Sequence, residues 1–246
     1  MHVSLHATRV AISAKPDHRF ADFCYDFCVV HFSGMAPSHE AKAKKERTVF
    51  GLFKKSEPEG PKYEQWIIAE LNARVRPLDR GEYFEDPLDE ALQAAGLGEV
   101  TGGGSMMSGD RDGISFVDLE INVLEDNAET RAKIIEVLES RGAPVGSKLK
   151  IEGQDDMPFG KAEGMGIYLN GTDLPDEVYA ESDVNDLIEA LSEGLDVSGE
   201  FRGYWESDLE TGLFFYGRSY DDMVAATAGV VESTPLCQLA KVERIA

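Results

Sequence analysis

Hydrophobic residues recur with two different periods along the last three quarters of the chain. One period is typical of strands and the other of helices, which predicts strands interleaved with helices. Residues 114–124 alternate with a period of two, as a half-buried strand does. The apolar face of that strand carries Val117, Leu119, Ile121 and Val123. Residues 127–141 instead place apolar side chains three or four positions apart, which is typical of an amphipathic helix, and Gly142 follows as a stop signal.

The same analysis predicts the order β-α-β-β-α-β twice, over residues 62–153 and 162–246. The elements expected in the first stretch are strand 66–71, a polar connection 74–85, helix 87–95, strands 100–107 and 114–124, helix 127–141 and an edge strand 148–151 protected by lysines. Those expected in the second are strand 166–170, an acidic connection 172–182, helix 183–194, a hairpin of 199–207 and 213–220, a helix 221–232 capped by Asp221, and strand 239–245. The predicted fold class is therefore α+β, a tandem repeat of two ferredoxin-like units with antiparallel sheets.

Matching residues recur in the same order in both stretches. Leu88-Asp-Glu-Ala-Leu92 matches Leu187-Ile-Glu-Ala-Leu191, and the other matches lie at offsets of 98 to 100 residues. The further pairs are Leu71 with Leu169, Pro77 with Pro175, Gly103 with Gly203, Gly113 with Gly212, and Phe116 with Phe215. Colinear matches at a nearly constant offset indicate one structural unit used twice.

A ferredoxin-like sheet has one face without helices. The alternation places Ile114 and Phe116 on that face in the first unit, and the matches assign Leu213 and Phe215 to it in the second. Large apolar side chains on two open faces are unfavourable in water. We therefore expect the halves to cover these positions against each other, as a monomer with an intramolecular pseudo-dimer, or to cover them in a homodimer.

Residues 1–61 differ in composition from the rest of the chain. They include all five histidines, and a polar, charged run is followed by a proline-rich stretch, so we predict a poorly structured extension and a linker. Val49-Phe-Gly-Leu-Phe-Lys-Lys55 is typical of a bacterial N-terminus, so translation beginning near Val49 is one hypothesis. A genuine mobile extension is the alternative.

The charge of the chain disfavours nucleic acid and anionic membranes as partners. The net charge is −22, and residues 153–200 carry thirteen acidic residues against the single Lys161. Such a field repels phosphates and attracts cations or basic proteins. No apolar run approaches the roughly 20 residues that a membrane helix needs, and three cysteines do not make a disulfide framework. We expect a cytoplasmic protein.

Candidate catalytic chemistry is sparse. From Val49 onward there is no histidine and only one cysteine, Cys237, which we interpret as a packing residue. Cys24, Cys28 and His31 do not match the usual zinc spacing. Acidic pairs are Asp110 with Asp112, Asp155 with Asp156, and Asp221 with Asp222, none within a complete Mg²⁺ or Ca²⁺ pattern. Gly102-Gly-Gly104 favours a bulged strand over a phosphate loop. We expect no cofactor and no bound metal.

The strongest candidate surface is acidic. Asp186, Glu189 and Glu193 share one helix face at spacings of three and four, and Glu181 lies close by. Tyr204 and Trp205 could supply aromatic anchors. The favoured hypothesis is an acidic interaction protein without catalysis, which binds and regulates or neutralises a basic partner. The alternatives are a pair of small-ligand-sensing domains and a metal-dependent hydrolase built on carboxylates.

Overall fold

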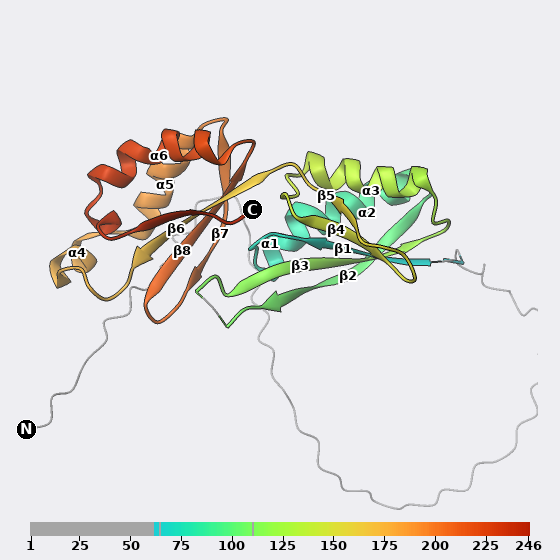
Figure 1. Ribbon diagram of the computed structural model, residues 1–246, viewed down its shortest axis with the longest axis horizontal. Coiled ribbons are helices and arrows are strands. Elements are labelled where there is room, and N and C mark those ends of the chain that lie inside the picture. The colour runs from blue at the N-terminus through green and yellow to red at the C-terminus, as the bar shows by residue number, and fades with distance from the viewer. Residues whose placement is uncertain (1–61, 64, 110) are drawn as a thin grey trace, which may run out of the picture. The chain divides into compact units, whose positions relative to one another are not determined.

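The described chain has a mixed α+β architecture with two antiparallel sheets (Figure 1). The computed structural model describes residues 62, 63, 65–109 and 111–246. The extension and linker expected over 1–61, with the Cys24, Cys28 and His31 cluster and the start near Val49, lie outside these residues. In the described part, no helix is both long and apolar enough to cross a membrane.

Each half of the described chain contributes one sheet. The first half contains β1 (Gln65–Leu71), α1 (Pro77–Arg80), the π-helical turn η1 (Gly81–Glu85), α2 (Asp86–Ala95), β2 (Gly98–Met107), β3 (Ile114–Val123), α3 (Ala128–Ser140), β4 (Ser147–Ile151) and β5 (Met157–Phe159). The second half contains β6 (Glu163–Asn170), α4 (Asp176–Glu181), α5 (Val184–Leu195), β7 (Gly199–Glu206), β8 (Glu210–Gly217), α6 (Tyr220–Ser233), the 3₁₀ turn η2 (Pro235–Cys237) and β9 (Lys241–Arg244). The strand orders are β2-β3-β1-β4-β5 and β7-β8-β6-β9.

The alternating pattern of β3 predicts its buried face correctly. Its four apolar residues with odd numbers are fully buried in one cluster with residues of α2 and α3, such as Leu88, Leu92, Ile134 and Leu138. Asn127 accepts a hydrogen bond from the backbone N–H of Thr130 and so caps α3. Gly96 ends α2 in the left-handed conformation, as a glycine after a helix commonly does.

Both expected connections contain helix. Pro77 opens α1 at a first helical position, where its missing N–H is not needed, and Phe84 of η1 is buried in the core. The prediction of a polar connection over 74–85 was therefore wrong, because the buried side chains of Val75 and Phe84 anchor the segment in the core. The acidic connection of the second half likewise contains α4.

Two further local predictions need correction. The strand 148–151 is not an edge strand, because β4 pairs with β5 on the side away from β1. Lys148 and Lys150 instead form ion pairs with Glu70 of β1. The helix expected to be capped by Asp221 is capped by Ser219, whose hydroxyl accepts from the backbone N–H of Asp222.

The glycine-rich strand is bulged, as expected. The register of β2 against β3 shifts between Val100 and Gly102, and that of β7 against β8 shifts between Phe201 and Gly203. The two glycines have φ values of 154° and 155°, which L side chains rarely adopt. The bulge therefore requires glycine at the corresponding place in both halves, and the counterpart of Gly203 is Gly102 instead of the expected Gly103.

The assignment of faces in β8 was wrong. Ile67 of β1 pairs with Ile121, whereas Met165 of β6 pairs with Phe215, so Phe215 corresponds to Ile121 and not to Phe116. Phe116 and Ile121 are five positions apart, and an odd shift exchanges the two faces of a strand. Leu213 and Phe215 consequently pack beneath the helices of their own half. Of the pair expected on the open face of β3, Ile114 is buried and Phe116 is half-buried.

Candidate functional site

Three aromatic rings of the second half are buried in the hydrophobic cluster of the first half. Tyr168 of β6 and Phe214 and Tyr216 of β8 are 1%, 1% and 4% exposed. They belong to the cluster that also contains buried residues of β1 and β3, and not to the cluster beneath α5 and α6. The face of the second sheet without helices is thus covered by the first half. Leu213 and Phe215, which the sequence analysis placed on this face, are not among the covered residues.

A glycine lies opposite each of these rings. In the β6–β8 ladder, Tyr168 pairs with Gly212, Gly166 with Phe214, and Gly164 with Tyr216. A Cβ atom at Gly164 would lie 3.0 Å from a ring carbon of Tyr216, and one at Gly212 would lie 3.2 Å from a ring carbon of Tyr168. Since glycine leaves this space empty, the rings can lie down across the neighbouring strand.

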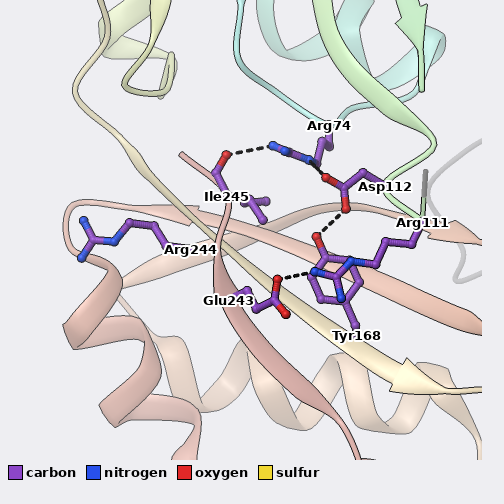
Figure 2. Close-up of a pocket in the computed structure, with 7 residues that line it drawn as sticks. All are labelled: Arg74, Arg111, Asp112, Tyr168, Glu243, Arg244 and Ile245. Carbon is purple, nitrogen blue, oxygen red and sulfur yellow. Dashed lines mark hydrogen bonds and ion pairs between the residues drawn. The ribbon is translucent and has the colours of Figure 1, made fainter. Parts of the chain in front are cut away.

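The tyrosine hydroxyls are satisfied by Arg74 and Asp112 of the first half. Tyr168 donates to Oδ1 of Asp112 at 2.5 Å, and Oδ2 of Asp112 accepts from Nε of Arg74 at 2.8 Å (Figure 2). The backbone N–H of Arg74 donates to the Tyr216 hydroxyl at 2.8 Å. Nη1 of Arg74 donates to the carbonyl oxygen of Ile245 at 2.9 Å. One arginine therefore connects three segments that are distant in sequence.

Burial keeps both phenols protonated. Burial, with the hydrogen bond to Asp112 as a second cause, raises the pKa of Tyr168 far above its usual range. Burial also raises the pKa of Tyr216. Burial lowers the pKa of Arg74, but Tyr216 and Asp112 outweigh it, so the net shift is upward and the guanidinium stays charged. The network thus keeps its donors and acceptors unchanged around neutral pH.

A hollow of about 550 Å³ opens beside this network and is called the Arg74 hollow. It is lined by Arg74, Arg111, Asp112, Tyr168, Glu243, Arg244 and Ile245 (Figure 2). The Arg111 guanidinium lies 3.8 Å from the centre of the Tyr168 ring and is paired with Glu243. Arg244 pairs with Glu163. The charged groups of this hollow therefore already satisfy one another.

A second hollow, of about 740 Å³, is called the Arg202 hollow. Its charged lining consists of Arg141, Lys161, Arg202 and Arg218 with Glu139, Asp196 and Glu200. Arg202 lies at the bulge of β7, is 8% exposed, and has its guanidinium 4.1 Å from the centre of the Tyr83 ring. Its Nη2 donates to the carbonyl oxygen of Arg141 at 3.1 Å and is paired with Glu200. Its Nε is buried and has no hydrogen-bond partner among the described residues.

The acidic residues singled out from the sequence lie on the surface. Asp186, Glu189 and Glu193 of α5 are exposed, as is Glu181 at the end of α4, and none has an ion pair among residues 62–63, 65–109 and 111–246. Tyr204 and Trp205 are half-buried and pack against different clusters. The Arg76 guanidinium lies 4.7 Å from the centre of the Tyr204 ring. Their role in docking stays a prediction.

The carboxylate pairs do not assemble into a metal centre in the described part of the chain, where no group of three or more His, Cys, Asp or Glu residues is placed to hold a metal. Asp112 is engaged by Arg74 and Tyr168, and Asp110 lies outside the described residues. Burial raises the pKa of Cys237 to about 11, so its thiol is protonated at neutral pH. Cys237 packs in the core, as expected.

The junction residues were missed from the sequence. Arg74 falls in a segment interpreted as a polar connection, and Arg202 is one cation in a strongly acidic half. One signal was present: every second residue of two segments is glycine or aromatic, in Gly164-Met-Gly-Ile-Tyr168 of β6 and Gly212-Leu-Phe-Phe-Tyr216 of β8. Paired strands of this composition indicate a face on which rings lie flat.

Removing the Asp112 carboxylate should destabilise the protein. In Asp112→Ala, the half-buried Arg74 guanidinium and the Tyr168 hydroxyl both lose their acceptor, which should cost about 2–3 kcal/mol. The matched control is Asp79→Ala, which breaks the more exposed Arg76–Asp79 pair and should cost less than about 0.5 kcal/mol. Urea unfolding at neutral pH measures both values. Equal losses would show that the junction network contributes no more than a surface ion pair.

No protein-family model matches this chain, and no curated protein does. Among solved structures, the regulatory subunit of aspartate kinase from Thermus flavus is 12% identical, with 69% of this chain and 94% of that chain covered and a TM-score of 0.24. A putative monooxygenase from Lactobacillus acidophilus is 14% identical, with 75% and 95% covered and the same TM-score. Similarity at this level carries no argument about the function of the chain.

Proposed function

We propose that this chain is a cytoplasmic tandem pair of ferredoxin-like units that binds a small ligand at their junction and acts as a regulatory sensor without catalysis. The common strand order supports the tandem pair: in each half the third strand lies between the second and the first, and the fourth follows the first. The bulges at Gly102 and Gly203 support it independently.

The observation that carries the sensing function is the Arg202 hollow. Its volume of about 740 Å³ falls within the range of small-molecule sites. It combines exposed polar side chains with a buried arginine whose Nε has no partner in the described part of the chain. Buried polar groups are nearly always hydrogen-bonded, so an unpaired one beside a hollow indicates a missing partner.

The position of the hollow provides a means of regulation. Arg141 follows α3 of the first half, whereas in the second half Arg202 belongs to β7 and Arg218 follows β8. A ligand held by both sets would stabilise the arrangement in which they converge. A ligand shifts a conformational equilibrium by its difference in affinity for the two states. In the proposed mechanism, ligand binding in the hollow therefore shifts the equilibrium between arrangements of the two halves.

A thermal-shift screen with amino acids and nucleotides tests the sensing function. At least one class should raise the melting temperature in a saturable manner, because ligands that bind only the folded state stabilise it by mass action. A ligand at 100 times its Kd should add about 2.7 kcal/mol to the free energy of unfolding. The absence of any saturable shift across the panel would contradict the proposal.

A second proposed function is the docking of a basic protein on the acidic face of α5. The observation in its favour is the exposure of Asp186, Glu189 and Glu193, which have no ion pairs within the described residues. Like charges at these spacings weaken a helix by a few tenths of a kcal/mol per pair, a small cost that a docking role would explain. Glu181, Tyr204 and Trp205 would complete the surface.

Pull-down from the source cell tests the docking function. The wild-type chain should capture a basic protein at low salt and release it as the salt concentration rises, because exposed charges are screened. The triple variant Asp186→Asn, Glu189→Gln, Glu193→Gln should capture much less. The control variant Glu129→Gln, Glu136→Gln neutralises exposed carboxylates of α3 and should retain capture. Binding that is insensitive to salt, or equal in both variants, would contradict docking on α5.

A further inference from the structure

We infer that the ligand of the Arg202 hollow is a small organic anion with a carboxylate or phosphate group, which Arg202, Arg141 and Arg218 bind in place of Glu200. This inference rests on the proposed sensing function and specifies the chemical class of its ligand. It depends on the charge of the hollow, the state of Arg202 and the position of the other two arginines.

The charge of the hollow is opposite to that of the chain. The protein has a net charge of −22, yet the hollow has four cationic residues against three carboxylates. Glu139 neutralises Lys161 at 2.5 Å. Three arginines then remain against Glu200 and Asp196. The Arg74 hollow has the same excess of one cation in its lining, but each of its arginines has a carboxylate partner. The distinguishing feature of the Arg202 hollow is therefore that its cations are incompletely paired, which favours the binding of an anion.

Arg202 is incompletely paired for a buried cation. Taking a guanidinium out of water costs several kcal/mol unless its donors are satisfied. The Arg202 side chain is 9% exposed, and its one anionic partner is Glu200, whose side chain is 60% exposed. Both hydrogen bonds of the guanidinium within the described chain are donated by Nη2, and Nε has no acceptor there. A carboxylate or phosphate can take two parallel bonds from an arginine fork, which Glu200 does not.

Glu200 therefore resembles a displaceable substitute for the ligand. Its carboxylate is mostly in solvent, so water screens its ion pair with Arg202 and weakens it. The anion that replaces it would neutralise the same guanidinium and would leave Glu200 in water. The exchange keeps one anion beside the Arg202 guanidinium and adds an acceptor for Nε.

Arg141 and Arg218 approach the same hollow from different elements. Nε of Arg141 donates to the carbonyl oxygen of Tyr83, and the side chain makes no ion pair in the described part of the chain. Arg218 follows β8, is exposed, and has neither a hydrogen bond nor an ion pair among the described residues. The Arg74 hollow differs in this respect, because Asp112, Glu243 and Glu163 already pair with its three arginines.

Titration with inorganic phosphate and with succinate, at an ionic strength held constant with chloride, tests the inference. Wild-type protein should show saturable stabilisation by at least one of the two anions in thermal shift and calorimetry. Arg218→Gln should weaken binding about tenfold, because it removes one charged contact of about 1.4 kcal/mol. Glu200→Gln should strengthen binding several-fold, because the competing carboxylate is lost.

Lys133→Gln is the matched control. It also removes one positive charge from a solvent-accessible side chain, but Lys133 lies on α3 in an ion pair with Glu136 and does not line the hollow. Its affinity for the anions should equal that of the wild type. Arg202 itself is left intact, because its stacking on Tyr83 also supports the fold.

The outcomes separate the inference from the function on which it rests. No saturable effect of either anion, or equal losses in Arg218→Gln and Lys133→Gln, would overturn the anion site. If neutral compounds alone stabilise the protein and Arg218→Gln binds them normally, the anion site is overturned and sensing stands. If no compound of any charge stabilises it, both are overturned. A response to phosphate alone or to succinate alone supports the inference and identifies the head group.

Discussion

The covering of the second sheet's open face is the constraint on which the rest of the structure depends. Tyr168, Phe214 and Tyr216 would expose a large aromatic surface if that face met water. They are buried only because the first half supplies both an apolar cluster and partners for the hydroxyls. Asp112 and Arg74 provide hydrogen bonds for the buried hydroxyls. Without these bonds, the free energy lost by burying the hydroxyls would offset much of the free energy gained by burying the rings.

The candidate site follows from the same junction. The aromatic rings pack in the apolar cluster of the first half, and two polar hollows lie beside this junction. In the Arg74 hollow every arginine has a carboxylate partner, which suits a structural connection. In the Arg202 hollow, Arg202 lies at the bulge of β7 beside Tyr83 with an Nε that has no hydrogen-bond partner among the described residues. The second hollow is therefore the better candidate for a ligand.

The sequence predicts local structure well and the junction poorly. Period-two alternation in β3 and the apolar spacing of α3 identify their buried faces, because each pattern reports directly on one core. The faces of β8 cannot be assigned in this way, because Leu213 to Tyr216 is apolar on both sides and both sides are buried. The sequence repeat also gave a wrong alignment of β8 with β3. The loop between β7 and β8 is shorter than the loop between β2 and β3, so the alignment was shifted by an odd number of residues, which exchanges the two faces of a strand. Arg74 and Arg202 give no sequence signal, since their partners come from distant segments.

Native-state hydrogen exchange over a range of urea concentrations tests the central claim most directly. If the junction joins both halves, the most protected amides of β3 and β8 should open with the same free energy and the same dependence on urea. Such behaviour is expected because exposing Tyr168, Phe214 and Tyr216 removes part of the core of the first half. Exchange of β6 and β8 through a separate opening of lower free energy, with β1 and β3 still protected, would contradict the account.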